Sequence, residues 1–134
     1  DNLPENLQKL FCRDNLIKSL DNLPISLLEL QCNGNKIKNL DLLPSNLEKL
    51  NCEDNEIILL DFLPPNIKSL DFSYNPITNF NNPPEKLEVL ICIGHNKLSL
   101  KNLPKDINKI YTDSVITNQN ELELNYPNLK ITIY

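Results

Sequence analysis

Residues 43–62 read LPSNLEKLNCEDNEIILLDF, and the same order of residue types returns every 20 residues along the chain. The shared template is LPxxLxxLxCxxNxIxxLxx, and copies of it begin near residues 3, 23, 43, 63, 83 and 103. A fixed period of this length is the sequence signature of a solenoid, in which each repeat buries its apolar face against its neighbours. The period alone therefore predicts a solenoid architecture.

Each repeat contains a short stretch in which polar and apolar residues alternate, such as Lys9 to Arg13. Alternation of this kind predicts one short strand per repeat, with Leu10 and Cys12 pointing inward and Phe11 pointing outward. Stacked repeats place these strands about 4.8 Å apart in one parallel sheet. A 20-residue turn leaves no room for a long helix on the return side. We therefore expect extended or polyproline-like segments there, with single 3-10 turns.

The LxxLxCxxN core resembles the leucine-rich repeat signature over nearly the whole chain. The 20-residue period with Leu-Pro at its head is similar to the LPX subclass of bacterial type III effectors, such as the IpaH and YopM proteins. Cysteine at the strand position departs from that subclass, which usually has an aliphatic residue there. The resemblance implies a leucine-rich repeat solenoid, a curved right-handed array with a parallel β-sheet on its concave side and extended or 3-10 segments on its convex side. We expect one domain over residues 1–134, with about six repeats and a C-terminal cap at 121–134 that contains a last strand.

One column of the repeat is asparagine, and we expect it to be structural. An inward amide side chain can both accept and donate hydrogen bonds to loop backbone that the turn leaves unpaired. In repeat five this position holds His95, which we interpret as loop filling rather than as a catalytic base, and residues 96–98 look shifted by one residue. In repeat six Val115 replaces the asparagine and Thr112 replaces the cysteine. The column consists of Asn15, Asn35, Asn55 and Asn75.

The four cysteines share one strand position, which Phe72 occupies in repeat four. This substitution favours core packing of small apolar side chains. Disulfides and zinc are the alternatives, but stacked Cβ vectors are parallel and a linear column does not converge on a metal. Reduced thiols also favour an intracellular location, the host cytoplasm if the chain is an effector. The cysteines are Cys12, Cys32, Cys52 and Cys92.

A second polar column is acidic and consists of Asp21, Asp41 and Asp61. We expect backbone N–H groups of the turn to offset the repulsion between these carboxylates, and a bound cation is the alternative.

Several function classes are disfavoured by composition. The net charge is −5 and Arg13 is the only arginine, which argues against nucleic acid and against an anionic membrane surface. No phosphate-binding loop, HExxH or CxxC motif is present, so we expect no cofactor, no metal site and no enzymatic activity in this chain. The pattern begins without an N-terminal cap, which indicates either a trimmed chain or the tail end of a longer array.

The remaining candidate is the outward face of the sheet, on the concave side, where repeat proteins commonly bind. Most of this face is polar, but Val89, Ile91 and Ile93 of repeat five all point outward. Such a patch either marks an interface or is covered by the chain's own tail or a neighbouring molecule. The candidate partner-binding residues are Phe11, Arg13, Gln31, Asn33, Asn51, Glu53, Asp71, Ser73, Tyr74, Val89, Ile91, Ile93 and Tyr111.

Three hypotheses about function follow. The chain is expected to be a non-enzymatic module that binds a protein partner on its concave face. Alternatively, it is the substrate-recognition part of a larger enzyme, as in effectors of the IpaH type, where a ubiquitin-ligase domain follows the repeats. A third reading is a structural array that self-associates end to end through its uncapped N-terminal repeat.

Overall fold

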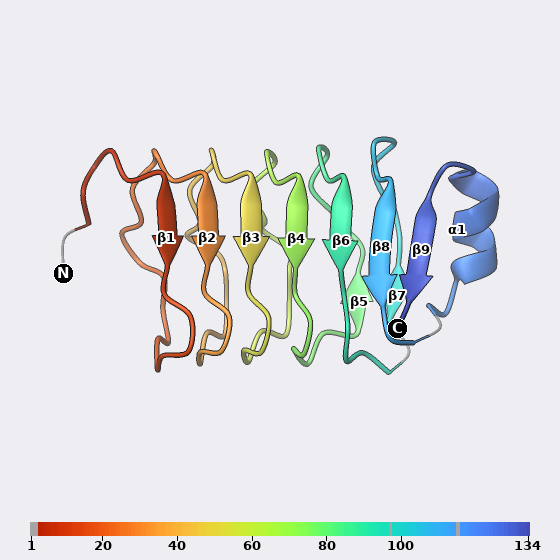
Figure 1. Cartoon of the computed structure of the whole chain (residues 1–134), viewed down its shortest axis with the longest axis horizontal. Coiled ribbons are helices and arrows are strands. Elements are labelled where there is room, and N and C mark those ends of the chain that lie inside the picture. Colours follow the sequence, from red (N-terminus) through yellow and green to blue (C-terminus); the bar gives the residue numbers. More distant parts are fainter. Residues whose placement is uncertain (1–2, 97, 115) are drawn as a thin grey trace.

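The computed structural model describes residues 3–96, 98–114 and 116–134 and shows a solenoid with a seven-stranded parallel sheet along one side (Figure 1). A second sheet of two strands, β5 (Asn79–Phe80) and β7 (Ser99–Leu100), lies behind it, and helix α1 (Gln119–Asn125) stands at the C-terminal end. The outward side of the seven-stranded sheet is called the sheet face below, and the opposite side the back face. The strands of the large sheet, in spatial order, are β1 (Lys9–Phe11), β2 (Glu29–Gln31), β3 (Lys49–Asn51), β4 (Ser69–Asp71), β6 (Val89–Ile91), β8 (Lys109–Thr112) and β9 (Lys130–Ile133).

The strand register follows the sequence period, because Leu10 pairs with Leu30 and Leu30 with Leu50, each 20 residues apart. The strands are shorter than predicted, since β1 ends at Phe11 rather than at Arg13. The backbone ladder nevertheless continues past the strand, with the N–H of Cys12 donating to the carbonyl of Gln31 at 2.9 Å. The chain therefore bends into the loop while still hydrogen-bonded to the next repeat.

The core fills the space between the two faces. The strand leucines Leu30, Leu70 and Leu90 are fully buried, and burying a leucine side chain contributes about 1.5–3 kcal/mol. Leu10 and Cys12 of the first repeat are only partly buried, because no repeat packs against the outer edge of β1 in this structure.

A proline at the second position of each repeat begins a tight turn. The carbonyl of Pro24 accepts a hydrogen bond from the N–H of Leu27 at 3.1 Å, and Pro44 and Leu47 repeat this contact. The turn brings the chain from the back face to the strand of the next repeat. No 3-10 helix occurs among the described residues, so extended segments and turns form the back face instead.

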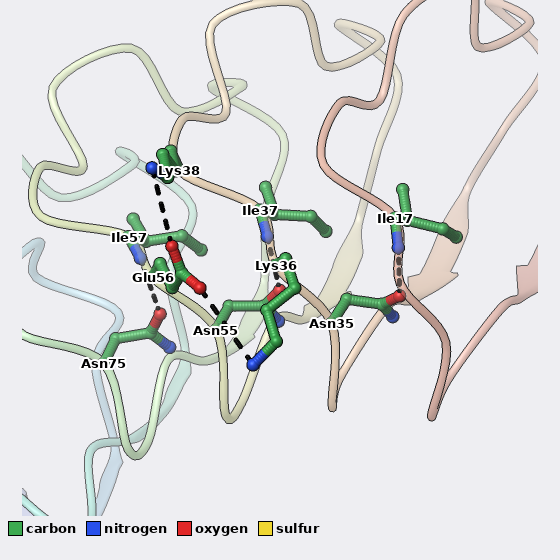
Figure 2. Close-up of polar contacts among 9 residues, drawn as sticks. All are labelled: Ile17, Asn35, Lys36, Ile37, Lys38, Asn55, Glu56, Ile57 and Asn75. Carbon is green, nitrogen blue, oxygen red and sulfur yellow. Dashed lines mark hydrogen bonds and ion pairs between the residues drawn. The ribbon is translucent and has the colours of Figure 1, made fainter.

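The asparagine column forms the predicted ladder inside the loops that follow the strands (Figure 2). Asn55 Oδ1 accepts a hydrogen bond from the N–H of Ile37 at 3.0 Å, which ties one repeat to the previous one. Its Nδ2 lies within hydrogen-bond distance of the carbonyls of Cys32, Cys52 and Glu53, at 3.1, 3.0 and 3.1 Å. The amide thus pairs loop groups that would otherwise be buried without partners.

The C-terminal end departs from the period. Strand β9 confirms the predicted closing strand and pairs with β8, but helix α1 was not predicted. Leu122 of α1 is buried, and the hydroxyl of Tyr126 donates to the carbonyl of Leu103 at 2.5 Å, which fixes the helix against the last full repeat. The predicted shift at residues 96–98 and the loss of the ladder at Val115 involve Lys97 and Val115, which lie outside the described residues.

Candidate functional site

The sheet face is polar over repeats one to three. Lys9 Nζ lies 3.0 Å from a carboxylate oxygen of Glu29, and this hydrogen bond holds the pKa of Glu29 below its ordinary value. Gln31 Nε2 donates to the same carboxylate at 3.3 Å. These side chains already have partners within the face. They offer a ligand a hydrated polar surface rather than unpaired groups.

Acidic side chains gather where β3 and β4 turn into the loops. Burial raises the pKa of Glu53, and the nearby carboxylates of Asp71, Asp54 and Asp14 raise it further. One oxygen of Asp71 is already used locally, because its Oδ1 accepts the N–H of Ser73 at 3.0 Å. Asn51 makes the same turn contact with the N–H of Glu53. The middle of the sheet face is therefore negatively charged, with the charge concentrated at the carboxyl ends of the strands.

Apolar side chains replace this polar surface at β6 and β8. Ile91, Ile93, Tyr111 and Tyr134 line a shallow, open depression of about 540 Å³. The rings of Tyr111 and Tyr134 stack, with centroids 6.2 Å apart and planes inclined by 21°. Val89, one step back along β6, is partly exposed beside them. We call Val89, Ile91, Ile93, Tyr111 and Tyr134 the apolar patch.

Tyr134 was missed by the sequence prediction, which treated the tail only as a cap. Its position follows from the strand alternation, because Ile131 pairs with the inward Ile110, and Thr132 pairs with the outward Tyr111. Two residues further along, Tyr134 returns to the sheet face, where it is 75% exposed. The cap strand therefore contributes to the same surface as the repeats.

The other predicted residues lie outside the patch. Phe11 is exposed, but it lies in β1, and β2, β3 and β4 separate it from β6. Arg13 is exposed beside it, and Gln31, Asn33, Asn51, Glu53 and Asp71 are partly exposed. Ser73 was wrongly expected on the surface, since it is 1% exposed. Its hydroxyl bonds the backbone of the next repeat, because the Oγ accepts the N–H of Ile93 at 3.0 Å.

Tyr74 borders the patch from the loop after β4. Its φ of 53° lies in the left-handed region, where a bulky residue is uncommon, and the residue is 54% exposed. The ring covers Gly94 of the next repeat, because a Cβ added at Gly94 would lie 2.5 Å from Tyr74 Cδ1. Glycine at 94 thus makes room for Tyr74, and the tyrosine is held at the rim of the apolar patch.

The cysteine column is core, as predicted. All four thiols are free, and Cys32, Cys52 and Cys92 are fully buried. Each of these three points its Sγ at a backbone carbonyl of the following repeat, at 3.4 Å for Cys32 and 3.2 Å for Cys52. Burial raises the pKa of Cys32 and of Cys92 to about 12. Thiols with such pKa values are poor nucleophiles at neutral pH.

His95 is buried at the asparagine position, where its ring and that of Phe72 lie 5.1 Å apart with their planes inclined by 63°. In the ladder, the asparagine Oδ1 accepts a backbone N–H of the previous repeat. His95 instead places its Nδ1 3.0 Å from a backbone carbonyl, that of Ile77. The N–H of Ile77 already donates to the carbonyl of Asn75 in the turn around Pro76. Nδ1 is therefore the protonated nitrogen, and Nε2 has no hydrogen-bond partner among the described residues. Burial lowers the pKa of His95, which favours the neutral form of the ring.

The acidic column does not behave as predicted. Asp21, Asp41 and Asp61 are exposed at the back-face turns, and none of the hydrogen bonds between described residues involves their carboxylates. Within residues 3–96, 98–114 and 116–134, no group of three His, Cys, Asp or Glu side chains could hold a metal ion. In the same part of the chain, no helix is long and apolar enough to cross a membrane.

Comparison with solved structures finds similarity to YopM from Yersinia enterocolitica WA-314, with a TM-score of 0.77 and 27% sequence identity. The match covers 100% of this chain and 30% of that chain, so this chain spans less than a third of the length of YopM. No family model and no curated protein matches the sequence.

Proposed function

We propose that this chain, a leucine-rich repeat protein whose repeats resemble those of YopM, is a non-enzymatic module that binds a protein partner on its sheet face. Solenoids of this fold are typically interaction scaffolds, because their stacked strands present a long, rigid surface. The sheet face would recognise its partner through the apolar patch as the anchor and through the acidic group around Glu53 and Asp71 as the polar border.

One observation carries this proposal: the apolar patch is not needed by the scaffold. In the sheet register, the positions of Gln31, Asn51 and Asp71 correspond to Ile91, so the fold accepts polar residues there. The apolar side chains at these positions of repeat five are only partly buried within the chain, so part of their surface is free for a partner. A surface of this kind, bordered by polar residues, is typical of a binding site.

The net charge of the chain and the side chains of the apolar patch indicate the class of partner. A net charge of −5 disfavours nucleic acid, and the stacked tyrosines with aliphatic neighbours suit a protein side chain. The buried, reduced cysteines fit an intracellular setting, and the likeness to YopM makes the cytoplasm of a host cell our proposed location.

The test uses substitutions that the repeats themselves supply. Ile91→Gln and Ile93→Asn introduce the residues that stand at the same positions in repeat two, so the fold should tolerate them. The wild-type chain and the double variant are immobilised, incubated with cell lysate, and the retained proteins are quantified by mass spectrometry. Phe11→Gln is the matched control, because it removes an exposed apolar side chain from the same face outside the patch.

We expect the double variant to lose a partner that both the wild type and Phe11→Gln retain. For the purified partner, we expect the Kd to rise by roughly tenfold or more, the effect of losing one or two buried aliphatic contacts. Thermal melts monitored by circular dichroism verify that all variants are folded. Equal retention by the folded double variant and the wild type would show that the patch is not the binding site.

A further inference from the structure

The back face of repeats two and three carries four large apolar side chains that the fold leaves in solvent. Leu42, Ile58, Leu59 and Phe62 are 64%, 61%, 62% and 74% exposed. Their neighbours Ile57 and Leu60 are buried and supply the core contacts of this segment. The four exposed side chains therefore do not contribute to the packing of the repeat.

The other repeats show that polar residues are accepted at these positions. Ile58 corresponds to Lys18 and Lys38, and Leu59 to Asn39 and Asn79, by the 20-residue period. Phe62 corresponds to Asn22, Asn82 and Asn102. An apolar group of this size that the scaffold does not need is a candidate docking surface.

Three of these side chains, Ile58, Leu59 and Phe62, line a groove of about 340 Å³ between the two repeats, which is formed by residues 38–41 and 58–63. We call this the back groove. Asp41 and Asp61 lie along it at equivalent positions of successive repeats, and both are exposed. None of the ion pairs within the described part of the chain involves either carboxylate.

The only cationic side chain lining the back groove, within the described residues, already has a partner. Lys38 Nζ lies 3.6 Å from Glu56, and Lys36 lies 4.0 Å from the same carboxylate (Figure 2). Asp41 and Asp61 are thus left as negative charges beside Leu59 and Phe62. An occupant that covers the apolar side chains must bring positive charge to these two carboxylates.

We propose that the back groove binds an extended segment of a partner protein in which apolar side chains alternate with lysine or arginine. The apolar side chains would pack against Leu59 and Phe62, and the cationic ones would pair with Asp41 and Asp61. A second copy of this chain is a poorer occupant, because it carries 18 acidic and 13 basic residues. This surface is separate from the sheet face, so the proposal does not rest on the function proposed above.

The test measures the Kd of fluorescein-labelled synthetic peptides by fluorescence anisotropy. One peptide alternates lysine with leucine, a second alternates glutamate with leucine, and a third alternates lysine with serine. The chain is tested as the wild type, as Leu59→Asn with Phe62→Asn, and as Asp41→Asn with Asp61→Asn. Two controls complete the set: Leu16→Asn, an 80% exposed back-face residue outside the groove, and Ile91→Gln with Ile93→Asn on the sheet face.

We expect the lysine–leucine peptide to bind at least about tenfold more tightly than the other two peptides. Each groove variant should weaken its binding by roughly tenfold, and the aspartate variant should also lose most of the salt dependence. Both controls should bind as the wild type does. Circular dichroism melts verify folding.

Three outcomes would overturn the proposal. Equal affinity for the lysine–leucine and lysine–serine peptides would mean that charge alone attracts the probe. Unchanged binding by both groove variants would show that the lysine–leucine peptide binds elsewhere on the chain. A concentration-dependent dimer in sedimentation velocity that Phe62→Asn abolishes would assign the back groove to a second copy of the chain.

Discussion

The side-chain oxygen of Asn55 accepts the backbone N–H of Ile37 at 3.0 Å, and this contact joins two successive repeats inside the core. The same amide also reaches three backbone carbonyls. The stability of the array therefore depends on polar groups as well as on leucine packing, because the loops would otherwise leave buried backbone groups unpaired.

We predict that Asn55→Ala lowers the free energy of unfolding by about 2–5 kcal/mol, since it removes these contacts without replacing them. Asn15→Ala is the matched control, because Asn15 is exposed and its side chain donates, among the described residues, only to the carbonyls of Cys12 and Arg13. Asn15→Ala should lower the free energy of unfolding by about 1 kcal/mol or less. Urea denaturation measures both values, and equal costs for the two variants would contradict the ladder account.

A second prediction concerns pH and His95. Burial holds the pKa of the folded ring below its ordinary value of 6.5, so the unfolded chain takes up a proton first as the pH falls. The stability of the wild type should therefore decrease, relative to His95→Asn, as the pH drops below about 6.5. Denaturation series at pH 5 to 8 give the difference between the two proteins. Parallel stability curves over this range would show that His95 does not titrate differently in the two states.

The pH prediction for Glu53 has the opposite sign, because its contribution to stability should rise, not fall, as the pH decreases. Its folded-state pKa is raised, first by burial and then by Asp71, Asp54 and Asp14, so ionised Glu53 opposes folding at neutral pH. Glu53→Gln should raise the Tm at pH 7. The gain should disappear below about pH 4, where Glu53 is protonated in both states, and should shrink in high salt as the repulsion is screened. Glu85→Gln, an exposed change of the same charge, should give a smaller gain, and an equal gain would mean that net charge alone is responsible.

The cysteines provide a chemical test of the core. At pH 8 we expect a thiol reagent such as DTNB to label Cys12 first, because Cys12 is partly exposed while Cys32, Cys52 and Cys92 are fully buried. The raised pKa of the buried thiols slows their reaction further. Peptide mapping identifies the labelled residues, and Cys12→Ser should remove the labelling of the native protein. Prompt modification of Cys52 under native conditions would contradict the packed cysteine column.

The period predicted those features that depend on repeat position alone. The strand register, the asparagine ladder and the cysteine core follow from it, because a residue's place in the 20-residue unit determines which way its side chain points. Ser73 was misplaced because its burial depends on its own side chain as well as on its repeat position: its Oγ accepts the N–H of Ile93, whereas Glu53 and Ile93 at the same position are partly exposed.

Helix α1 was not predicted for a different reason. It departs from the period and has only seven residues, a length at which tertiary contacts such as those of Leu122 and Tyr126 decide the structure. The placement of Tyr134 beside Tyr111 depends on the same cap, because the register of β9 on β8 sets it. The apolar strand of repeat five was visible in the sequence, whereas the depression that it forms with the cap was not.

The central claim is that the apolar patch contacts the protein partner, and photocrosslinking tests it most directly. Benzoylphenylalanine is introduced in separate proteins at Tyr111, Tyr134 and Phe11, so that an aromatic ring replaces an aromatic ring inside and outside the patch on the same face. After irradiation with the partner retained by the wild-type chain, we predict covalent adducts from positions 111 and 134 and none from position 11. Adducts only from position 11, with none from 111 or 134, would contradict the account.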